Sequence, residues 1–253
     1  MMHTGVAYVR SILFSLGFIV LLILITPVVL IMAVTRIPYT IRYATMRQWA
    51  RFCIWWLKLT CKIRYEIEGA ENIPDEPVIV FSKHQSTWET LFLPSLTSRH
   101  QAWILKQELM WVPFFGWAMA AIGTIPIIRG SGRTAIKRII ESGRRYMNEG
   151  SWIMVFPEGT RVAPGEEKRF GIGGAMLAAS TSARVLPVAH NAGEFWPRKG
   201  FIKYAGTIRV VIGEPIDTAD MKADTVNEVI DAWMRQAMHK INPAIYPLSK
   251  TSQ

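Results

Sequence analysis

Residues 12–34 form an apolar run of 23 residues without a charged side chain. As an α-helix rising about 1.5 Å per residue, this run is long enough to cross the ~30 Å hydrocarbon core of a bilayer. Its length, the single Arg10 before it and the lack of a small-residue cleavage site after it favour a retained anchor over a signal peptide. Pro27 predicts a kink or a division into two helices. A helix that spans the bilayer and one inserted from a single side both remain open.

The positive charge of the chain is concentrated around this run. Residues 1–65 contain eight Lys and Arg side chains and no Asp or Glu, while the whole chain has a net charge of +10. A basic chain can bind nucleic acid, but here the excess charge flanks a hydrophobic segment and does not cover a polar face. We therefore expect anionic membrane lipids as partners of this region, and no nucleic acid.

A second helix is predicted over residues 39–60. On a helical wheel Arg47, Arg51 and Lys58 lie within about 40° of one another, and aromatic and aliphatic side chains crowd the remaining surface. This pattern is typical of a helix in a membrane interface, although an ordinary domain helix with a wide apolar face would also produce it. Residues 1–62 are therefore predicted to form a membrane-associated two-helix motif, with helices over 12–34 and 39–60.

From residue 63 onward, short β-rich runs alternate with helical patterns. The predicted strands are residues 78–82, 102–105, 123–128, 152–156, 184–189 and 207–212. The predicted helices are residues 86–96, 114–121, 133–149, 172–181 and 224–240. This alternation predicts an α/β fold with a mostly parallel mixed sheet flanked by helices. We expect the domain to cover residues 63–248, followed by a frayed tail, 249–253.

His84 occupies the turn between the strand predicted at 78–82 and a helix that begins near Ser86. Sites in α/β sheets lie at the carboxyl ends of strands. From the first helical turn, the Glu89 carboxylate can fold back to the imidazole, fix its tautomer and leave the other ring nitrogen to accept a proton from an alcohol. Ser86 and Glu89 also form a plausible capping box, so a purely structural role remains open.

A second polar turn, Pro157 to Arg161, follows the strand that ends at Phe156. Gly159 permits close approach of backbone N–H groups to an anion. Arg161 offers a planar guanidinium suited to phosphate, and Glu158 can accept a bond from a glycerol hydroxyl or brace the arginine. The alternative is a surface turn with a Glu–Arg salt bridge.

Arg129 ends the strand predicted at 123–128 and would lie at the same sheet edge, where it could bind a second phosphate oxygen. The alternative is a core strand with a charged terminus.

These motifs occur in one order along the chain: His84-x4-Glu89, Gly123 to Arg129, Phe156-Pro-Glu-Gly-Thr-Arg161 and Leu186-Pro187-Val188. The order and spacing resemble the glycerolipid acyltransferase family, and in particular the bacterial 1-acyl-sn-glycerol-3-phosphate (lysophosphatidic acid) acyltransferases. The resemblance covers roughly residues 60–215 and extends to the predicted pair of N-terminal membrane-associated helices.

The resemblance implies that His84 is the general base and Glu89 its partner, and that Pro187 lies in a motif for acyl-donor binding or packing. It further implies that the glycerol phosphate is bound by Arg129, Glu158, Gly159, Thr160 and Arg161. The chain departs from the family pattern in two places. Glu89 stands where the family usually has Asp, and Ile-Pro-Ile-Ile precedes Arg129 where the family often has Phe and an acidic residue. The acceptor headgroup therefore remains open.

We expect direct transfer of a fatty acyl group from acyl-CoA or acyl-carrier protein to the free hydroxyl of lysophosphatidic acid, giving phosphatidic acid. The alternatives are another lyso-acceptor such as a lyso-ornithine lipid, a thioester hydrolase, and a membrane scaffold without enzymatic activity. We expect the bacterial inner membrane as the location, with the α/β domain facing the cytoplasm. No metal site or other cofactor is predicted, because the five histidines are scattered and the two cysteines, Cys53 and Cys61, lie in the apolar N-terminal part.

Overall fold

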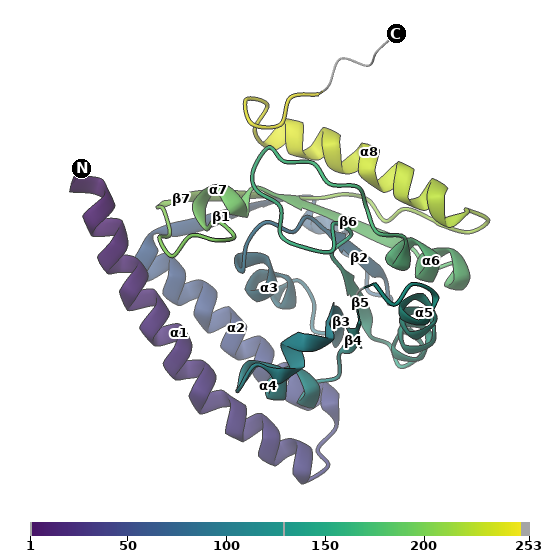
Figure 1. Ribbon diagram of the computed structural model, residues 1–253, viewed down its shortest axis with the longest axis horizontal. Coiled ribbons are helices and arrows are strands. Elements are labelled where there is room, and N and C mark those ends of the chain that lie inside the picture. The colour runs from purple at the N-terminus through teal and green to yellow at the C-terminus, as the bar shows by residue number, and fades with distance from the viewer. Residues whose placement is uncertain (1, 129, 249–253) are drawn as a thin grey trace.

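The computed structural model describes residues 2–128 and 130–248 of the chain (Figure 1). Two long helices come first, α1 (Met2–Val34) and α2 (Tyr39–Cys61). The strands are β1 (Ile63–Glu68), β2 (Ile79–Ser82), β3 (Gln101–Lys106), β4 (Ile125–Ile127), β5 (Trp152–Val155), β6 (Val185–His190) and β7 (Gly206–Ile212). The remaining α-helices are α3 (Trp88–Phe92), α4 (Phe115–Ala121), α5 (Arg133–Asn148), α6 (Ile172–Thr181), α7 (Ala192–Phe195) and α8 (Ala223–Ile241). Short 3-10 helices are η1 (Ala70–Asn72), η2 (Leu93–Ser95) and η3 (Gln107–Trp111).

The strands form one seven-stranded sheet in the order β1-β7-β6-β2-β5-β3-β4. Strands β6 and β7 pair antiparallel, and the other neighbours in this sheet pair parallel. The predicted mostly parallel mixed sheet is therefore confirmed. Because β2, β5, β3, β4 and β6 run in the same direction, their carboxyl ends meet at one edge, and the segments that follow β2 and β5 become neighbours there.

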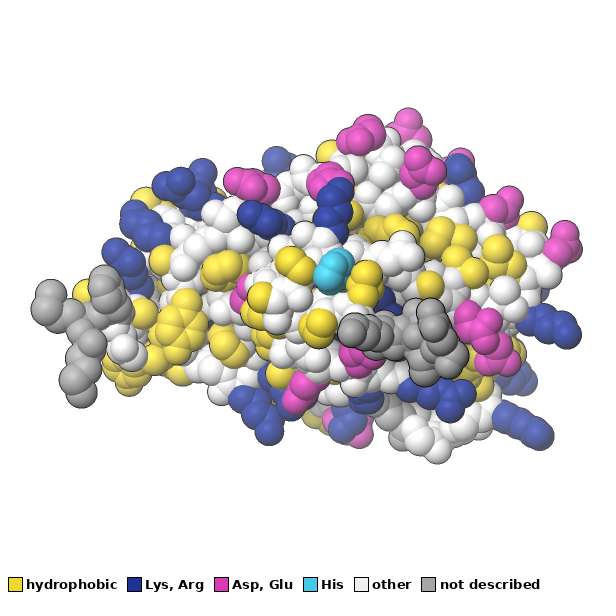
Figure 2. All heavy atoms as spheres, turned by 90° about the horizontal axis from the view of Figure 1, so that it is seen from above, with side chains coloured by type: hydrophobic (Ala, Val, Ile, Leu, Met, Phe, Trp, Pro, Cys, Tyr) yellow, Lys and Arg dark blue, Asp and Glu magenta, His cyan; other side chains and the backbone are white. Residues whose placement is uncertain are grey.

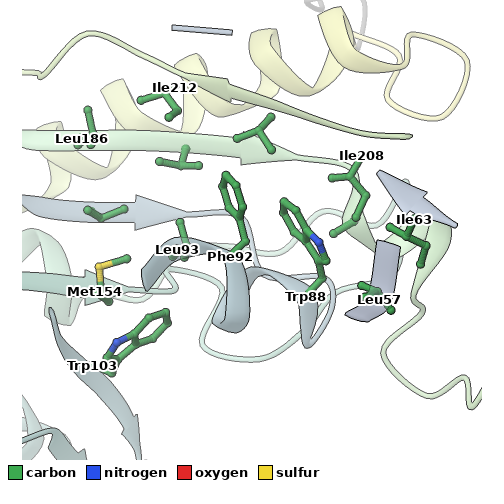
Figure 3. Packing of buried hydrophobic residues seen from close by; sticks show 14 of the residues in the cluster. Leu57, Ile63, Trp88, Phe92, Leu93, Trp103, Met154, Leu186, Ile208 and Ile212 are labelled. Atoms are coloured by element: carbon green, nitrogen blue, oxygen red, sulfur yellow. The ribbon is translucent and has the colours of Figure 1, made fainter. Parts of the chain in front are cut away.

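Both faces of the central strands are buried, which is why these strands read as unbroken apolar runs. In β2, Val80 contributes to the core on the side of α2 and α3, and its neighbours Ile79 and Phe81 point to the side of α5, α6 and α8. On the first side the rings of Trp88 and Phe92 are stacked, with their centroids 4.4 Å apart, and pack against the sheet (Figure 3). This packing fixes α3, the helix that follows the His84 turn.

Helix α1 lies along α2 and the edge of the α/β domain (Figure 1). It is the helix among the described residues that is long and apolar enough to cross a membrane, and only 11% of its most apolar window is buried. Near its start, Ser11 Oγ accepts a hydrogen bond from Lys203 N (2.9 Å). Near its end, Thr26 Oγ1 donates to Phe114 O (3.4 Å). Both halves of α1 are thus attached to the α/β domain.

Several local expectations differ from the structure. The apolar helix begins at Met2, ahead of the apolar run, and continues through Pro27 without a division. In α2, Arg51 and Lys58 are exposed, but Arg47 donates to the carbonyl of Thr97 (2.9 Å), so the predicted basic stripe is incomplete. Strand β1 was not predicted because its side chains after the first are exposed, which gives it no apolar run. The helix predicted at residues 86–96 is divided into α3 and η2. The tail, 249–253, lies outside the described residues.

Candidate active site

His84 lies two residues beyond β2, and the Glu89 carboxylate from the first turn of α3 folds back to it, as predicted. His84 Nδ1 lies 2.9 Å from Glu89 Oε1. Because an ionised carboxylate only accepts, Nδ1 carries the proton and donates it to Glu89. The other ring nitrogen, Nε2, has no hydrogen-bond partner among the described residues, and it is left as the basic nitrogen of the ring.

The capping interpretation of Glu89 is also correct in part. Glu89 Oε1 accepts hydrogen bonds from the backbone N–H groups of Gln85 (2.9 Å) and Ser86 (2.8 Å). Ser86 Oγ accepts from Trp88 N (3.2 Å). One carboxylate oxygen therefore binds the backbone of the turn before α3 and orients His84 at the same time, so the two interpretations are not exclusive. The N-cap of α3 is Thr87 and not the predicted Ser86, and no side chain caps it.

The electrostatic surroundings keep Glu89 ionised although it is fully buried. Burial raises its pKa, but the neighbouring His190 and His84 rings and the N–H of Ser86 outweigh that effect, and the pKa lies below its ordinary value. His190, at the end of β6, donates from Nε2 to Lys83 O (2.8 Å), and its Nε2 lies 4.0 Å from Glu89 Oε2. Burial lowers the pKa of His190. His190 thus holds the turn before His84 through its bond to Lys83 O, while its Nδ1 accepts from Ala192 N (3.3 Å).

The Pro157–Arg161 turn follows β5 and is attached to the His84 turn. Val162 N donates to the carbonyl of His84 (2.8 Å). Phe156 stacks on the His84 ring, with centroids 3.9 Å apart and planes inclined by 13°. The imidazole plane is therefore fixed on one side by an aromatic ring and at one edge by Glu89.

Glu158 is buried and binds the His84 turn, which excludes a surface Glu–Arg pair. Its Oε1 lies 2.7 Å from Lys83 Nζ, and its Oε2 accepts from His84 N (3.0 Å). Burial raises the pKa of Glu158, and Lys83 and His84 oppose that shift. Both carboxylate oxygens are thus engaged in holding the turn, and the predicted contact of Glu158 with a glycerol hydroxyl would compete with these bonds.

Arg161, at the end of the Pro157–Arg161 turn, reaches the same site. Its side chain lines a cavity of about 200 Å³ together with His84. Burial lowers the pKa of Arg161, while Glu89 opposes the shift. No hydrogen bond or ion pair occupies its guanidinium among the described residues, so the group is available to an anion.

The shape of this turn depends on Gly159, which has a φ of +67°. A Cβ at this position would meet open space, so glycine is favoured here by the backbone conformation and not by crowding. Thr160, the next residue, is exposed and makes no hydrogen bond to His84 among the described residues.

The rest of the cavity wall is mostly apolar, although Arg47 and Lys106 also line it. Residues from α1, α2, α3, β3, η3 and α4 form this wall, and its apolar members include Phe18, Leu22, Met46, Leu91, Trp103, Leu105, Leu109, Phe115 and Met119. A hydrocarbon chain fits such a lining. His84 is consequently in contact both with the polar turn and with an apolar space.

Two further residues were predicted for the site. Arg129 falls outside the described residues. Pro187 is buried in the middle of β6, where it is in register with Phe81 and its carbonyl accepts from Gly213 N (3.0 Å). Its position is that of a packing residue in the sheet.

Three residues of the site were not given a role from the sequence, and a fourth, Lys83, was expected only to add positive charge at this sheet edge or to be solvated. Phe156 directly precedes the Pro157–Arg161 turn, so adjacency was a signal that could have found it. His190 and Gln85 offered no such signal. Gln85 is fully buried, and its side chain donates to Tyr246 Oη (2.8 Å) and accepts from Gly193 N (3.3 Å). These contacts join segments that are far apart in the chain.

Comparison with known proteins agrees with this geometry. The family model described as Acyltransferase matches residues 64–191. The chain is 41% identical over 211 residues to the 1-acyl-sn-glycerol-3-phosphate acyltransferase of Pseudomonas aeruginosa, and the match covers 82% of each protein. It is 33% identical over 171 residues to a chloroplastic 1-acyl-sn-glycerol-3-phosphate acyltransferase of Arabidopsis thaliana, covering 64% of this chain and 46% of that protein.

The fold is shared with a solved structure. The crystal structure of the 1-acyl-sn-glycerophosphate acyltransferase PlsC from Thermotoga maritima matches with a TM-score of 0.78, at 20% identity, over 96% of this chain and 99% of that chain. A histidine held by a carboxylate at the edge of this sheet, the extent of the family match and the identity to the Pseudomonas protein lead to one conclusion: the chain belongs to the acyltransferase family.

Proposed function

We propose that this protein transfers a fatty acyl group from a soluble acyl thioester to the free hydroxyl of lysophosphatidic acid, giving phosphatidic acid at the membrane. The observation that carries the proposal is the position of His84: its ring is oriented by Glu89, and it lines an apolar cavity together with the guanidinium of Arg161. The relatives named for this reaction support the choice of lysophosphatidic acid as acceptor.

In the proposed reaction His84 Nε2 removes the proton of the acceptor hydroxyl as its oxygen attacks the thioester carbonyl carbon. Glu89 stabilises the imidazolium that forms, because its carboxylate lies 2.9 Å from Nδ1. The tetrahedral intermediate then expels the thiolate, which takes the proton from His84 and leaves as the free thiol. The products are the ester and CoA or acyl-carrier protein, and no acyl-enzyme forms.

Arg161 would bind the acceptor phosphate, and its shielded position strengthens that contact. Arg129 would add a second contact, as the family resemblance implies. Glu158 and Lys83 would support the turn from which His84 and Arg161 act, and Gly159 would give that turn its shape. The apolar cavity would hold an acyl chain while the thioester lies next to His84.

The proposed location is the cytoplasmic face of the bacterial inner membrane, where soluble thioesters and lysolipids meet. The attachment of both halves of α1 to the α/β domain favours a helix that lies along one side of the bilayer. A spanning α1 would draw the polar surface around Lys203 and Ser11 toward the hydrocarbon core.

A matrix of donors and acceptors tests this proposal. Purified protein would be assayed with acyl-CoA and acyl-carrier protein against lysophosphatidic acid and a lyso-ornithine lipid, and with no acceptor. We expect acyl transfer to lysophosphatidic acid, its loss in His84→Ala, and retained vesicle binding by that variant. Thiol release without acceptor would support a hydrolase, and near-normal turnover by His84→Ala would contradict the role of His84.

Arg161→Gln distinguishes the acceptors. Loss of the guanidinium should raise the KM for lysophosphatidic acid by roughly 10-fold or more, because a charge-assisted contact to phosphate contributes about 1.5–3 kcal/mol. A lyso-ornithine lipid has no phosphate, so its KM should change much less. Equal KM changes for both acceptors would contradict phosphate binding by Arg161.

A further inference from the structure

The segment that joins β3 to β4 exposes large apolar side chains on its outer side. Leu109 and Trp111 of η3 are 39% and 77% exposed, and Val112 and Trp117 are 43% and 45% exposed. Residues 109–128 contain no charged side chain. Such a patch is unusual on a surface that faces water, because the large apolar area of each exposed tryptophan is then not buried.

This apolar patch (Leu109, Trp111, Val112 and Trp117) lies on a segment that packs against α1. Helix α4 packs on the C-terminal half of α1 through Val29, Ala118 and Ile122 (Figure 1). The neighbouring α1 surface exposes its own apolar row: Leu16, Ile19, Val20, Ile23, Leu24, Val28 and Ile31. Two elements that pack against each other therefore both expose apolar side chains.

A tight turn at residues 113–115 fixes the backbone within the patch. Phe114 has φ +61° and ψ −58°, and Phe115 N donates to Pro113 O (2.7 Å), a γ-turn that phenylalanine rarely adopts. Gly116 packs against Met110, where a Cβ would lie 2.3 Å from the carbonyl oxygen. The turn places Phe115 in the wall of the cavity that contains His84 and leaves Trp111 and Trp117 outside.

We propose that η3 and the start of α4 form a third membrane-contacting element, which inserts its apolar patch into the same leaflet as α1 and borders the cavity from the lipid side. Tryptophan favours the membrane interface, and the absence of charge over residues 109–128 removes the main cost of insertion. By contrast, the face on the side of α8 carries Lys, Arg, Asp and Glu side chains around much of its outline, as in water (Figure 2). The inference rests on the membrane contact of α1 in the proposed function.

Site-directed fluorescence tests this contact. An environment-sensitive probe would be attached at Trp111→Cys, at Leu16→Cys on α1 as the positive control, and at Val229→Cys on α8 as the negative control; Val229 is 37% exposed. The native Cys53 and Cys61 are buried, and burial raises the pKa of both thiols, so they should react little. Unsubstituted protein would measure that background.

Each labelled protein would bind phosphatidylethanolamine–phosphatidylglycerol vesicles with nitroxide on the acyl chains, after its thermal midpoint is shown to match the unlabelled protein. We expect the probe at 111 to be quenched to at least about half the extent of the probe at 16, and the probe at 229 to be nearly unaffected. Quenching at 16 and not at 111 would overturn the inference and leave the membrane contact of α1 intact. Absence of quenching at 16 and at 111 would overturn both this inference and the membrane contact of α1.

A second copy of the chain is the other possible cover for the patch. In that case the probe at 111 would become shielded without lipid as the protein concentration rises, and light scattering would show a dimer. That result would also overturn the inference.

Discussion

Glu89→Gln separates the two roles that the structure gives to one carboxylate. The substitution keeps the size of the side chain and an oxygen that can accept from His84 Nδ1, Gln85 N and Ser86 N. It removes the charge. With 2.9 Å between His84 Nδ1 and Oε1, the attraction between imidazolium and carboxylate is about 6 kcal/mol at an effective dielectric constant of 20.

The activation free energy should rise by the part of that attraction that develops in the transition state, and each 1.4 kcal/mol of that rise lowers kcat about tenfold. If about half to all of the attraction develops there, kcat falls roughly 10²- to 10⁴-fold. The glutamine nitrogen would also face His190 Nε2, itself a donor, in place of Glu89 Oε2. A buried amide without an acceptor costs about 1–3 kcal/mol, so the thermal midpoint should fall by several degrees.

The assay compares acyl transfer per folded molecule with the thermal midpoint. Ser86→Ala is the matched control, because it removes the bond from Trp88 N to Ser86 Oγ and leaves the His84–Glu89 contact in place. It should lower the midpoint through a loss of about 0.5–2 kcal/mol while kcat stays within about threefold of the parent. A Glu89→Gln variant with less than a tenfold loss of kcat would refute the catalytic reasoning and leave only the cap.

Three further outcomes are expected. Lys83→Met should destabilise the fold by about 3–5 kcal/mol because it leaves the buried Glu158 unpaired, and adding Glu158→Gln should recover part of that loss in urea unfolding; a double variant less stable than the single one would contradict this. Gly116→Ala should cost about 1–3 kcal/mol of stability, because the new methyl group meets a backbone carbonyl oxygen at 2.3 Å, and an unchanged unfolding midpoint would show that the turn is not tightly packed. Burial raises the pKa of Cys53 from 9.0, and that of Tyr246 from 10.0, to about 12. The stability that these two groups contribute is therefore complete below pH 9 and is lost as the pH rises through 12. A thermal midpoint that stays constant from pH 8 to 11 would contradict this expectation.

The site was predictable where its residues are close in sequence. His84 and Glu89 are five residues apart across a strand-to-helix turn, so their contact follows from local geometry. The role of Glu158 was not predictable, because its choice of Lys83 over the nearby Arg161 depends on which strands are neighbours. His190 belongs to the site because β6 lies next to β2, and Gln85 is held there by the C-terminal segment at Tyr246. Neither contact could be predicted from spacing along the chain.

The sequence by itself determined the apolar N-terminal helix, the two buried strands that lead into the His84 and Pro157–Arg161 turns, and the alternation of strands and helices. These features depend on composition and period, which are local. Only the tertiary structure decided that α1 is attached to the domain at both Ser11 and Thr26, that β1 pairs with β7 at the sheet edge, and that Phe156 covers His84. Each of these is a contact between distant segments, and its free energy comes from burying surfaces that exist only once the sheet has formed.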